Sequence, residues 1–280
     1  MLGMAGTPGP GSAGPPRWPA AMPRRGTVAL LHGMMSLGTT WWRVGPELAV
    51  RGWDVRTLDL AGHGSSPPLA GPLTVTALVE KVVADLDGPV DLLIGHSLGA
   101  RTAISAVTRH PGLARAVVLE DPPGGDLVPA EELARGIELD GELVRTDRDR
   151  LLRRSATDNP GWAAPDVEQD VEGIARAQIA VVAAGVRGGL RDADLTPLVA
   201  GAPVPVLLVV AAETGRRFGD GPGGSALAEP ARAGVRAALP GHRFVELPGG
   251  HCLHRDLPDQ WLAAVTAFAD EVLPPTAPAR

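Results

Sequence analysis

Short, mostly apolar runs alternate with helical patterns along most of this chain, and no other feature constrains its fold as strongly. Apolar runs separated by helices are typical of parallel strands that are buried on both faces of a sheet. The pattern therefore predicts an α/β fold, in which a mostly parallel sheet is flanked by helices. We expect strands at 27–31, 54–58, 90–94, 115–119, 204–210 and 243–247, and helices at 38–51, 74–86, 98–110, 226–238 and 258–272.

The regular alternation breaks once, between residues 123 and 200, where the chain carries many charges and helical periodicity but no clear strand. Its best helix pattern covers 166–186. About 80 residues greatly exceed one ordinary crossover between parallel strands, so we predict a helical cap over 123–200 on a core formed by 27–122 and 201–273. Long crossover helices lying on the sheet are the alternative. Residues 1–26 are rich in Pro, Gly, Ala and Ser, and we expect a flexible tail there.

Composition excludes several classes of function. The net charge is −6, whereas proteins that bind nucleic acid carry basic patches, so no nucleic-acid partner is expected. The longest apolar stretches, such as 179–186 and 206–212, fall far short of the roughly 18 residues that span a bilayer. Cys252 is the only cysteine, which excludes an intrachain disulfide and a zinc site built from several cysteines. Residues 1–26 lack the apolar stretch of a secretory signal, so a cytoplasmic location is the default expectation, and the oligomeric state stays open.

Residues 95–99, Gly-His-Ser-Leu-Gly, carry the strongest chemical signal, because they follow a predicted strand and open a predicted helix. This is the context of a nucleophile elbow. A sharp strand-to-helix turn holds the serine in a strained conformation with its hydroxyl clear of the sheet, and glycines on either side avoid crowding that turn. The positive end of the following helix points at a developing oxyanion. Ser97 is therefore the candidate nucleophile.

The turn after the first predicted strand, His32-Gly33-Met34, is the candidate oxyanion loop. The backbone N–H groups of Met34 and Leu98 would together hold the oxyanion. We take the side chains of His32, Met35 and Trp162 as candidates for substrate contact, with Trp162 roofing the pocket from the cap.

His251 is the candidate general base, because it follows a Gly-Gly pair at the end of the last predicted strand, where a loop can present it to the serine. His254 is its nearest rival, but it lies a helical turn further along the chain. No metalloprotease, P-loop or dinucleotide-binding motif is present, so no metal or cofactor is expected.

Taken together, these motifs resemble the α/β-hydrolase superfamily, in particular its bacterial esterases with a cap domain. His32-Gly33 is similar to the family's oxyanion loop, and residues 59–66, Asp-Leu-Ala-Gly-His-Gly-Ser-Ser, are similar to its D-x-x-G-H-G-x-S turn. The elbow and the segment 250–258 complete the resemblance, which extends from about residue 27 to 272. The fold hosts many reactions, so the resemblance specifies the fold more closely than the reaction.

The family order implies an acid between the serine and the histidine, after the strand that follows the cap. Here that place offers Glu213, although the family commonly shows a Gly-x-x-Asp ending that this chain lacks. Some superfamily members carry the acid one strand earlier, where this chain has Asp121. We favour Glu213 and keep Asp121 as the alternative, with Asp220 a distant third.

The resemblance implies a serine hydrolase that acts by two-step acyl transfer on a small or medium ester, thioester or lactone. The substrate is expected to be a small molecule. The same residues could instead serve C–C bond or amide hydrolysis, or lyase or cyclase chemistry. A non-catalytic ligand-binding protein of the same fold is the remaining alternative, and it would gain support if neither candidate acid contacted His251.

Overall fold

A computed structural model describes residues 14–125, 128–191, 194–212, 224–240 and 243–274. It contains a seven-stranded sheet in the order β1-β3-β2-β4-β5-β6-β7, and each neighbouring pair from β3 to β7 is parallel. The strands are β1 (Arg17–Trp18), β2 (Gly26–Leu31), β3 (Trp53–Leu58), β4 (Val90–His96), β5 (Ala114–Glu120), β6 (Val206–Ala211) and β7 (Phe244–Leu247). The predicted α/β fold with a mostly parallel sheet is confirmed.

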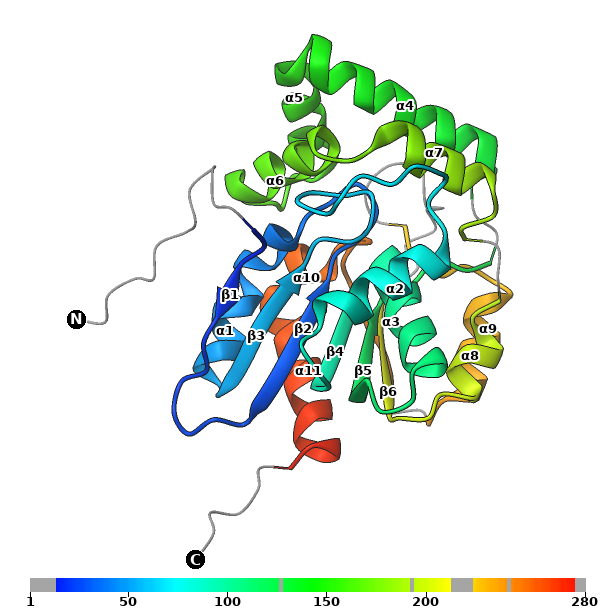
Figure 1. The fold of residues 1–280 in the computed structure, drawn as a ribbon. Helices are drawn as coiled ribbons and strands as arrows, with labels where there is room; N and C mark the ends of the chain where they lie inside the picture. The colour runs from blue at the N-terminus through cyan, green and yellow to red at the C-terminus, as the bar shows by residue number, and fades with distance from the viewer. Residues whose placement is uncertain (1–13, 126–127, 192–193, 213–223, 241–242, 275–280) are drawn as a thin grey trace, which may run out of the picture.

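Helices cover both faces of the sheet (Figure 1). The short 3-10 helix η1 (Gly38–Trp42) leads into α1 (Val44–Val50), so the helix expected at 38–51 forms in two parts. The other helices of the core are α2 (Val75–Asp85), α3 (Leu98–Arg109), α8 (Thr196–Ala200), α9 (Ala231–Ala238), α10 (Leu253–Asp256) and α11 (Pro258–Val272).

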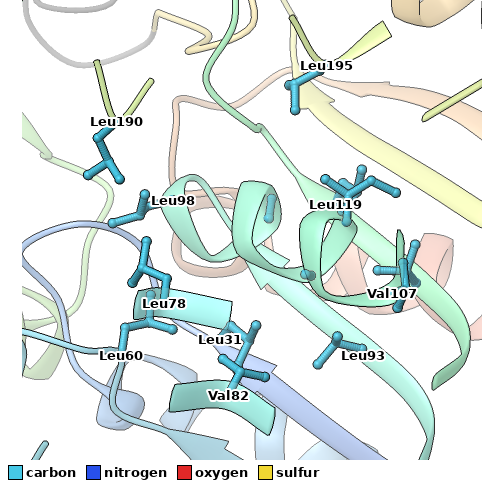
Figure 2. Close-up of a cluster of buried hydrophobic side chains, with 14 of the residues drawn as sticks. Leu31, Leu60, Leu78, Val82, Leu93, Leu98, Val107, Leu119, Leu190 and Leu195 are labelled. Carbon is cyan, nitrogen blue, oxygen red and sulfur yellow. The ribbon is translucent and has the colours of Figure 1, made fainter. Parts of the chain in front are cut away.

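Successive strand residues point to opposite faces, and they fill two separate apolar cores. Leu31 and Leu93 pack on the side of α2 and α3, where Figure 2 shows them with Val107 of α3. Leu30 and Leu92 pack on the side of α1 and α11. Because the strands are apolar on both faces, they show the continuous apolar runs on which the fold prediction depends.

Four helices form a separate layer at one end of the sheet (Figure 1). They are α4 (Ala130–Thr146), α5 (Arg148–Asp158), α6 (Ala164–Ala175) and α7 (Ile179–Arg187), and they pack on one another. This layer sits over the loop that follows β2, since a Cβ on Gly173 of α6 would lie 2.3 Å from the carbonyl oxygen of Met35. Helix α8, by contrast, packs on α3 and α9. We refer to the layer formed by α4 to α7 as the cap.

The helix expected at 166–186 is divided between α6 and α7. Gln178 lies at the break, where its backbone N–H donates to the oxygen of Gly62 and its side-chain oxygen accepts from the N–H of Leu69. Contacts with a distant loop therefore override the continuous helical periodicity.

The tail predicted over residues 1–26 is wrong for its later part, because β1 pairs antiparallel with β3. Trp18 explains why this segment is ordered. Its ring packs on the core beside Gly45, and a Cβ on residue 45 would overlap the ring. One large apolar side chain supplies the burial that the composition of this segment lacks. No helix within the described ranges is long and apolar enough to cross a membrane.

Candidate active site

Ser97 stands at the sharp turn between β4 and α3, as the elbow motif predicts. Its φ of 51° and ψ of −116° are a strained conformation for a residue with a side chain. The turn is held by the N–H of Ser97, which donates to the oxygen of Glu120 on the neighbouring strand at 2.8 Å. A Cβ on Gly95 would lie 2.2 Å from the oxygen of Gly99, so the turn closes only with glycine there.

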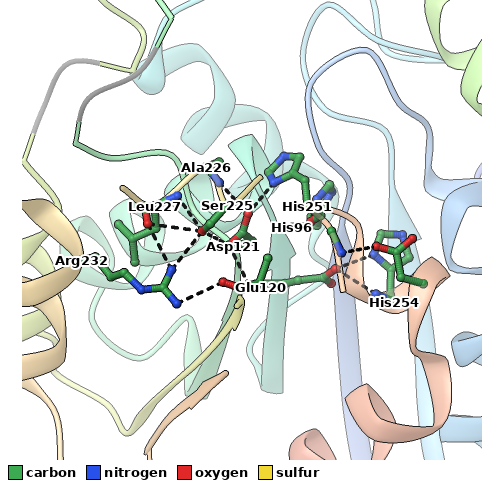
Figure 3. Close-up of polar contacts among 12 residues, drawn as sticks. His96, Glu120, Asp121, Ser225, Ala226, Leu227, Arg232, His251 and His254 are labelled. Atoms are coloured by element: carbon green, nitrogen blue, oxygen red, sulfur yellow. Dashed lines mark hydrogen bonds and ion pairs between the residues drawn. The ribbon is translucent and has the colours of Figure 1, made fainter. Parts of the chain in front are cut away.

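Asp121, which the sequence offered as the alternative acid, is the carboxylate that the structure brings to His251. The Nδ1 of His251 lies 2.6 Å from Oδ2 of Asp121, whose side chain is fully buried at the end of β5 (Figure 3). Glu213 and Asp220 lie outside the described residues. This contact assigns Nδ1 to the carboxylate and leaves Nε2 as the ring nitrogen that can take a proton from serine.

Three further donors hold the Asp121 carboxylate in place. Oδ1 accepts from the N–H of Ala211 at 3.1 Å and from the hydroxyl of Ser225 at 2.6 Å, and Oδ2 accepts from the N–H of Ala226 at 2.8 Å. Asp121 itself has a φ of 41°, in the left-handed region that Asp tolerates better than most residues. A carboxylate with so many donors is fixed in orientation, so it can orient the imidazole in turn.

His96 links the elbow to the segment 250–258, which contains His251 and which we call the histidine loop. Its Nε2–H donates to the backbone oxygen of His251 at 3.0 Å, and the two ring centroids lie 4.7 Å apart. Burial, followed by the nearby His251 and His254, holds the pKa of His96 well below its usual value, so the ring stays neutral at physiological pH. The residue next to the nucleophile therefore sets the place of the candidate base.

The loop after β2 passes directly over the elbow. A Cβ on Gly33 would lie 3.3 Å from Cβ of Ser97 and 2.7 Å from Nδ1 of His96, so this close approach requires glycine. The N–H of the next residue but one, Met35, donates to Nε2 of His63 at 3.1 Å. This hydrogen bond with His63 fixes the position of the loop. The amides of Met34 and Leu98 stay the predicted oxyanion donors.

His63 predicts loss of stability in acid. Burial is the largest cause that lowers the pKa of His63 to about 3, so between pH 6.5 and about 3 the unfolded chain binds a proton that the folded chain does not. The contribution of this histidine to the free energy of unfolding should therefore be present above about pH 6.5 and be lost as the pH falls through this window, by about 1 kcal/mol from pH 6.5 to 5.5. Urea unfolding at several pH values measures the slope, which His63→Asn should reduce. A variant with an unchanged slope would contradict this account.

His32 does not offer a ring nitrogen to a substrate, and its predicted role in substrate contact is wrong. Its side chain is fully buried, its Nδ1 donates to the oxygen of Gly33 at 2.7 Å, and its Nε2 accepts from the N–H of Leu60 at 2.9 Å. Both nitrogens are used to join the oxyanion loop to the segment that follows β3. The position beside the loop suggested substrate contact, but the need to satisfy backbone groups decides its role.

A cavity of about 220 Å³ opens between the oxyanion loop and the cap. Met34 and Met35, from the loop that follows β2, form part of its wall, and substrate contact by Met35 stays a prediction. The cap supplies the remaining lining residues, which are Ile137, Asp140, Leu151, Arg154, Ser155, Asp158, Asn159, Asp170 and Ile174. The wall therefore combines apolar side chains from the loop and the cap with polar side chains from the cap.

Trp162 lies next to this cavity but points to the histidine loop. Its backbone N–H donates to the oxygen of Asn159, a lining residue, and its indole Nε1–H donates to Oδ1 of Asp256 at 2.6 Å. The other oxygen of Asp256 accepts from the N–H of Gly250 at 2.7 Å. Burial raises the pKa of Asp256. Asp256 falls within the segment 250–258 that resembles the family, but no local pattern assigns it a role, because its two partners come from the cap and from the backbone of Gly250.

A second buried pair of a histidine and a carboxylate lies beside the first (Figure 3). Oε1 of Glu120 accepts from Nδ1 of His254 at 2.8 Å and from its backbone N–H at 3.0 Å. The Nε2 of His254 lies 2.8 Å from Oγ1 of Thr40, which also accepts from Nε of Arg255 at 3.0 Å. His254 is therefore held between β5 and η1 with both ring nitrogens in contact with buried side chains, and we assign it a structural role. Over the residues that the structure describes, no group of three or more His, Cys, Asp or Glu side chains is arranged to hold a metal ion.

Comparison with known proteins agrees with this geometry. A family model described as "Alpha/beta hydrolase family" matches residues 28–265. The chain is 33% identical to a lipase, LipV, of Mycobacterium tuberculosis H37Rv over 60% of this chain and 55% of the lipase. It is 34% identical to a pimeloyl-[acyl-carrier protein] methyl ester esterase of Neisseria meningitidis serogroup A over 37% of this chain and 35% of the esterase.

A solved structure, the enol-lactonase of Burkholderia xenovorans LB400, matches 90% of this chain and 94% of its own with a TM-score of 0.69. The two chains are 20% identical, so this likeness bears on the fold alone. The chain spans about half the length of the matched lipase and about a third of the matched esterase.

Proposed function

Because this chain belongs to the alpha/beta hydrolase family, we propose that it is a hydrolase that transfers the acyl group of a small or medium ester, thioester or lactone through Ser97, His251 and Asp121. The observation that carries the proposal is the 2.6 Å contact between the buried Asp121 and Nδ1 of His251, beside the strained Ser97. This contact removes the condition that would favour a non-catalytic binding protein, namely that no candidate acid contacts His251.

The proposed mechanism gives each group one role. His251 takes the proton of the Ser97 hydroxyl, which attacks the carbonyl carbon, and Asp121 stabilises the imidazolium that forms. The amides of Met34 and Leu98 donate to the oxyanion, and the positive end of α3 adds to its stabilisation. His251 then gives its proton to the leaving group. Water, activated by the same histidine, releases the acyl group from Ser97.

The cavity supports a small acyl group. Its volume of about 220 Å³ leaves room for a small group and not for a long acyl chain. The methionine wall next to the oxyanion loop suits an apolar chain, because Met adapts its shape to what it contacts. The names of the relatives, a lipase and a methyl ester esterase, also support ester hydrolysis.

Reaction with a fluorophosphonate, followed by intact-mass spectrometry and peptide mapping, tests the proposal. We expect one adduct on the wild-type protein, located on Ser97, and none on Ser97→Ala, because only an activated serine attacks phosphorus at a useful rate. Ser105→Ala, which removes another buried serine two turns along α3, is the matched control and should keep the adduct. A folded wild-type protein without an adduct would overturn the proposed function. Esters, thioesters and amides of matched acyl groups would then rank the reaction classes.

A further inference from the structure

The cap contacts the histidine loop through a short series of hydrogen bonds that the mechanism does not use. Trp162, between α5 and α6, donates its indole N–H to Oδ1 of Asp256 at 2.6 Å, and Oδ2 of Asp256 accepts from the N–H of Gly250 at 2.7 Å. Gly250 immediately precedes His251. One carboxylate thus connects a cap side chain to the backbone that carries the candidate base.

Both ends of this connection are held firmly. Arg255, which is buried, places its guanidinium 4.5 Å from the centroid of the Trp162 ring and donates to Oγ1 of Thr40 at 3.0 Å. At the cap end, the N–H of Trp162 bonds to Asn159, whose side chain donates to the oxygen of Ser155 at 2.9 Å. Asn159 and Ser155 both line the cavity.

We propose that Trp162 and Asp256 are positioning residues that hold His251 in line with Asp121 only while the cap is seated on the core, an inference that rests on the proposed function. A change at the cavity wall reaches the histidine loop through Asn159, Trp162 and Asp256. Trp162 therefore acts on the rate of reaction and not on the affinity for substrate, in contrast to its predicted role as the roof of the pocket.

Trp162→Phe is the sharpest variant, because it removes the indole N–H and keeps an aromatic ring for Arg255. We expect kcat to fall by about 3- to 10-fold with KM nearly unchanged. Asp256→Ala removes both bonds and should lower kcat by about 10- to 100-fold, since small misplacements of a catalytic group are costly. Asp256→Asn keeps one acceptor oxygen and should recover part of that loss.

The double variant tests whether the two residues act together. If they do, Trp162→Phe combined with Asp256→Ala should be no slower than Asp256→Ala alone, because the indole N–H has already lost its acceptor. Independent effects would instead multiply. Trp42→Phe is the matched control, since its indole N–H donates to Oδ1 of Asp166 of the cap at 2.8 Å and not to Asp256. The backbone oxygen of Asp166, which this variant leaves in place, accepts from Arg255 at 3.4 Å. Trp42→Phe should leave kcat within about 2-fold of wild type.

Hydrogen exchange gives a readout that does not depend on activity. We expect the peptide that contains Gly250 and His251 to exchange faster in Trp162→Phe and Asp256→Ala, and at the wild-type rate in Trp42→Phe. Wild-type exchange in Trp162→Phe, a rise in KM alone, or equal effects in Trp42→Phe would each overturn the proposal. If the wild-type protein formed no fluorophosphonate adduct, the proposed function would fail, and exchange at Gly250 would still decide whether Trp162 and Asp256 hold the loop. Thermal melting identifies any variant that fails to fold, in which case Asp256→Asn replaces Asp256→Ala.

Discussion

Asp121→Asn should lower kcat by about 10⁴-fold while the protein stays folded. The asparagine amide can present a nitrogen to His251 where the carboxylate presented an oxygen, so the imidazole loses the acceptor that fixes its tautomer. Oδ2 of Asp121 lies 2.6 Å from Nδ1 of His251, and no charge then stabilises the imidazolium as it forms. Steady-state hydrolysis of a reactive ester measures kcat, and the rate of fluorophosphonate labelling measures the attack by Ser97 separately.

Two controls make this result specific. Glu213→Gln removes the other candidate acid and should change kcat by less than about 3-fold if Asp121 is the acid. Asp121 also accepts from Ser225 and from two backbone N–H groups, so Asp121→Asn costs some stability, and a melting curve must accompany the rates. A large loss of kcat in Glu213→Gln with little change in Asp121→Asn would contradict the assignment.

The acid shows where sequence reasoning reaches its limit. Strands β5 and β6 are neighbours in the sheet, and both end at the edge where β4 delivers Ser97. Asp121 follows β5 directly and Glu213 comes two residues after β6 in the sequence, so the order of strands alone does not choose between them. The choice depends on a contact across 130 residues of chain, which no local pattern records. The elbow itself could be predicted, because its glycines, serine and flanking elements are all local.

The positions of the strands could be predicted for a related reason. A strand buried on both faces must be apolar at every position, so its signal is short and does not depend on its partners. Structure that depends on a single side chain contacting a distant segment cannot be predicted in this way. Trp18 orders a segment whose composition predicts a tail, and Gln178 interrupts a helix whose periodicity is continuous. Each outcome is decided by tertiary contacts that the pattern of one segment does not contain.

The second large effect is expected at Gly99, on the first turn of α3. A Cβ there would lie 2.4 Å from the oxygen of Leu31 and 2.5 Å from that of His32, and both atoms belong to the backbone at the end of β2. Neither can move as a flexible side chain would, so Gly99→Ala must push α3 away from the sheet. We expect a loss of about 3 kcal/mol of stability, or a fall in Tm of about 6 °C or more.

Gly136→Ala is the matched control, because Gly136 lies inside helix α4 with nothing within 4 Å of an added Cβ. Alanine is the better helix former, so this variant should gain about 0.5–1 kcal/mol. The two substitutions make the same chemical change with opposite signs, which separates steric overlap from helix propensity. Equal effects in the two variants would contradict the close packing of α3 on β2.

Gly99→Ala should also slow the chemistry at temperatures where the variant is still folded. The displacement begins at the turn that carries Ser97 and the amide of Leu98, the proposed oxyanion donor, and moving one such donor costs about 10²- to 10³-fold in kcat. Fluorophosphonate labelling well below the new Tm measures this loss apart from unfolding. If Gly99→Ala melted early but reacted at the wild-type rate, the amide of Leu98 would not be an oxyanion donor, and the loop at Met34 would have to supply that stabilisation alone.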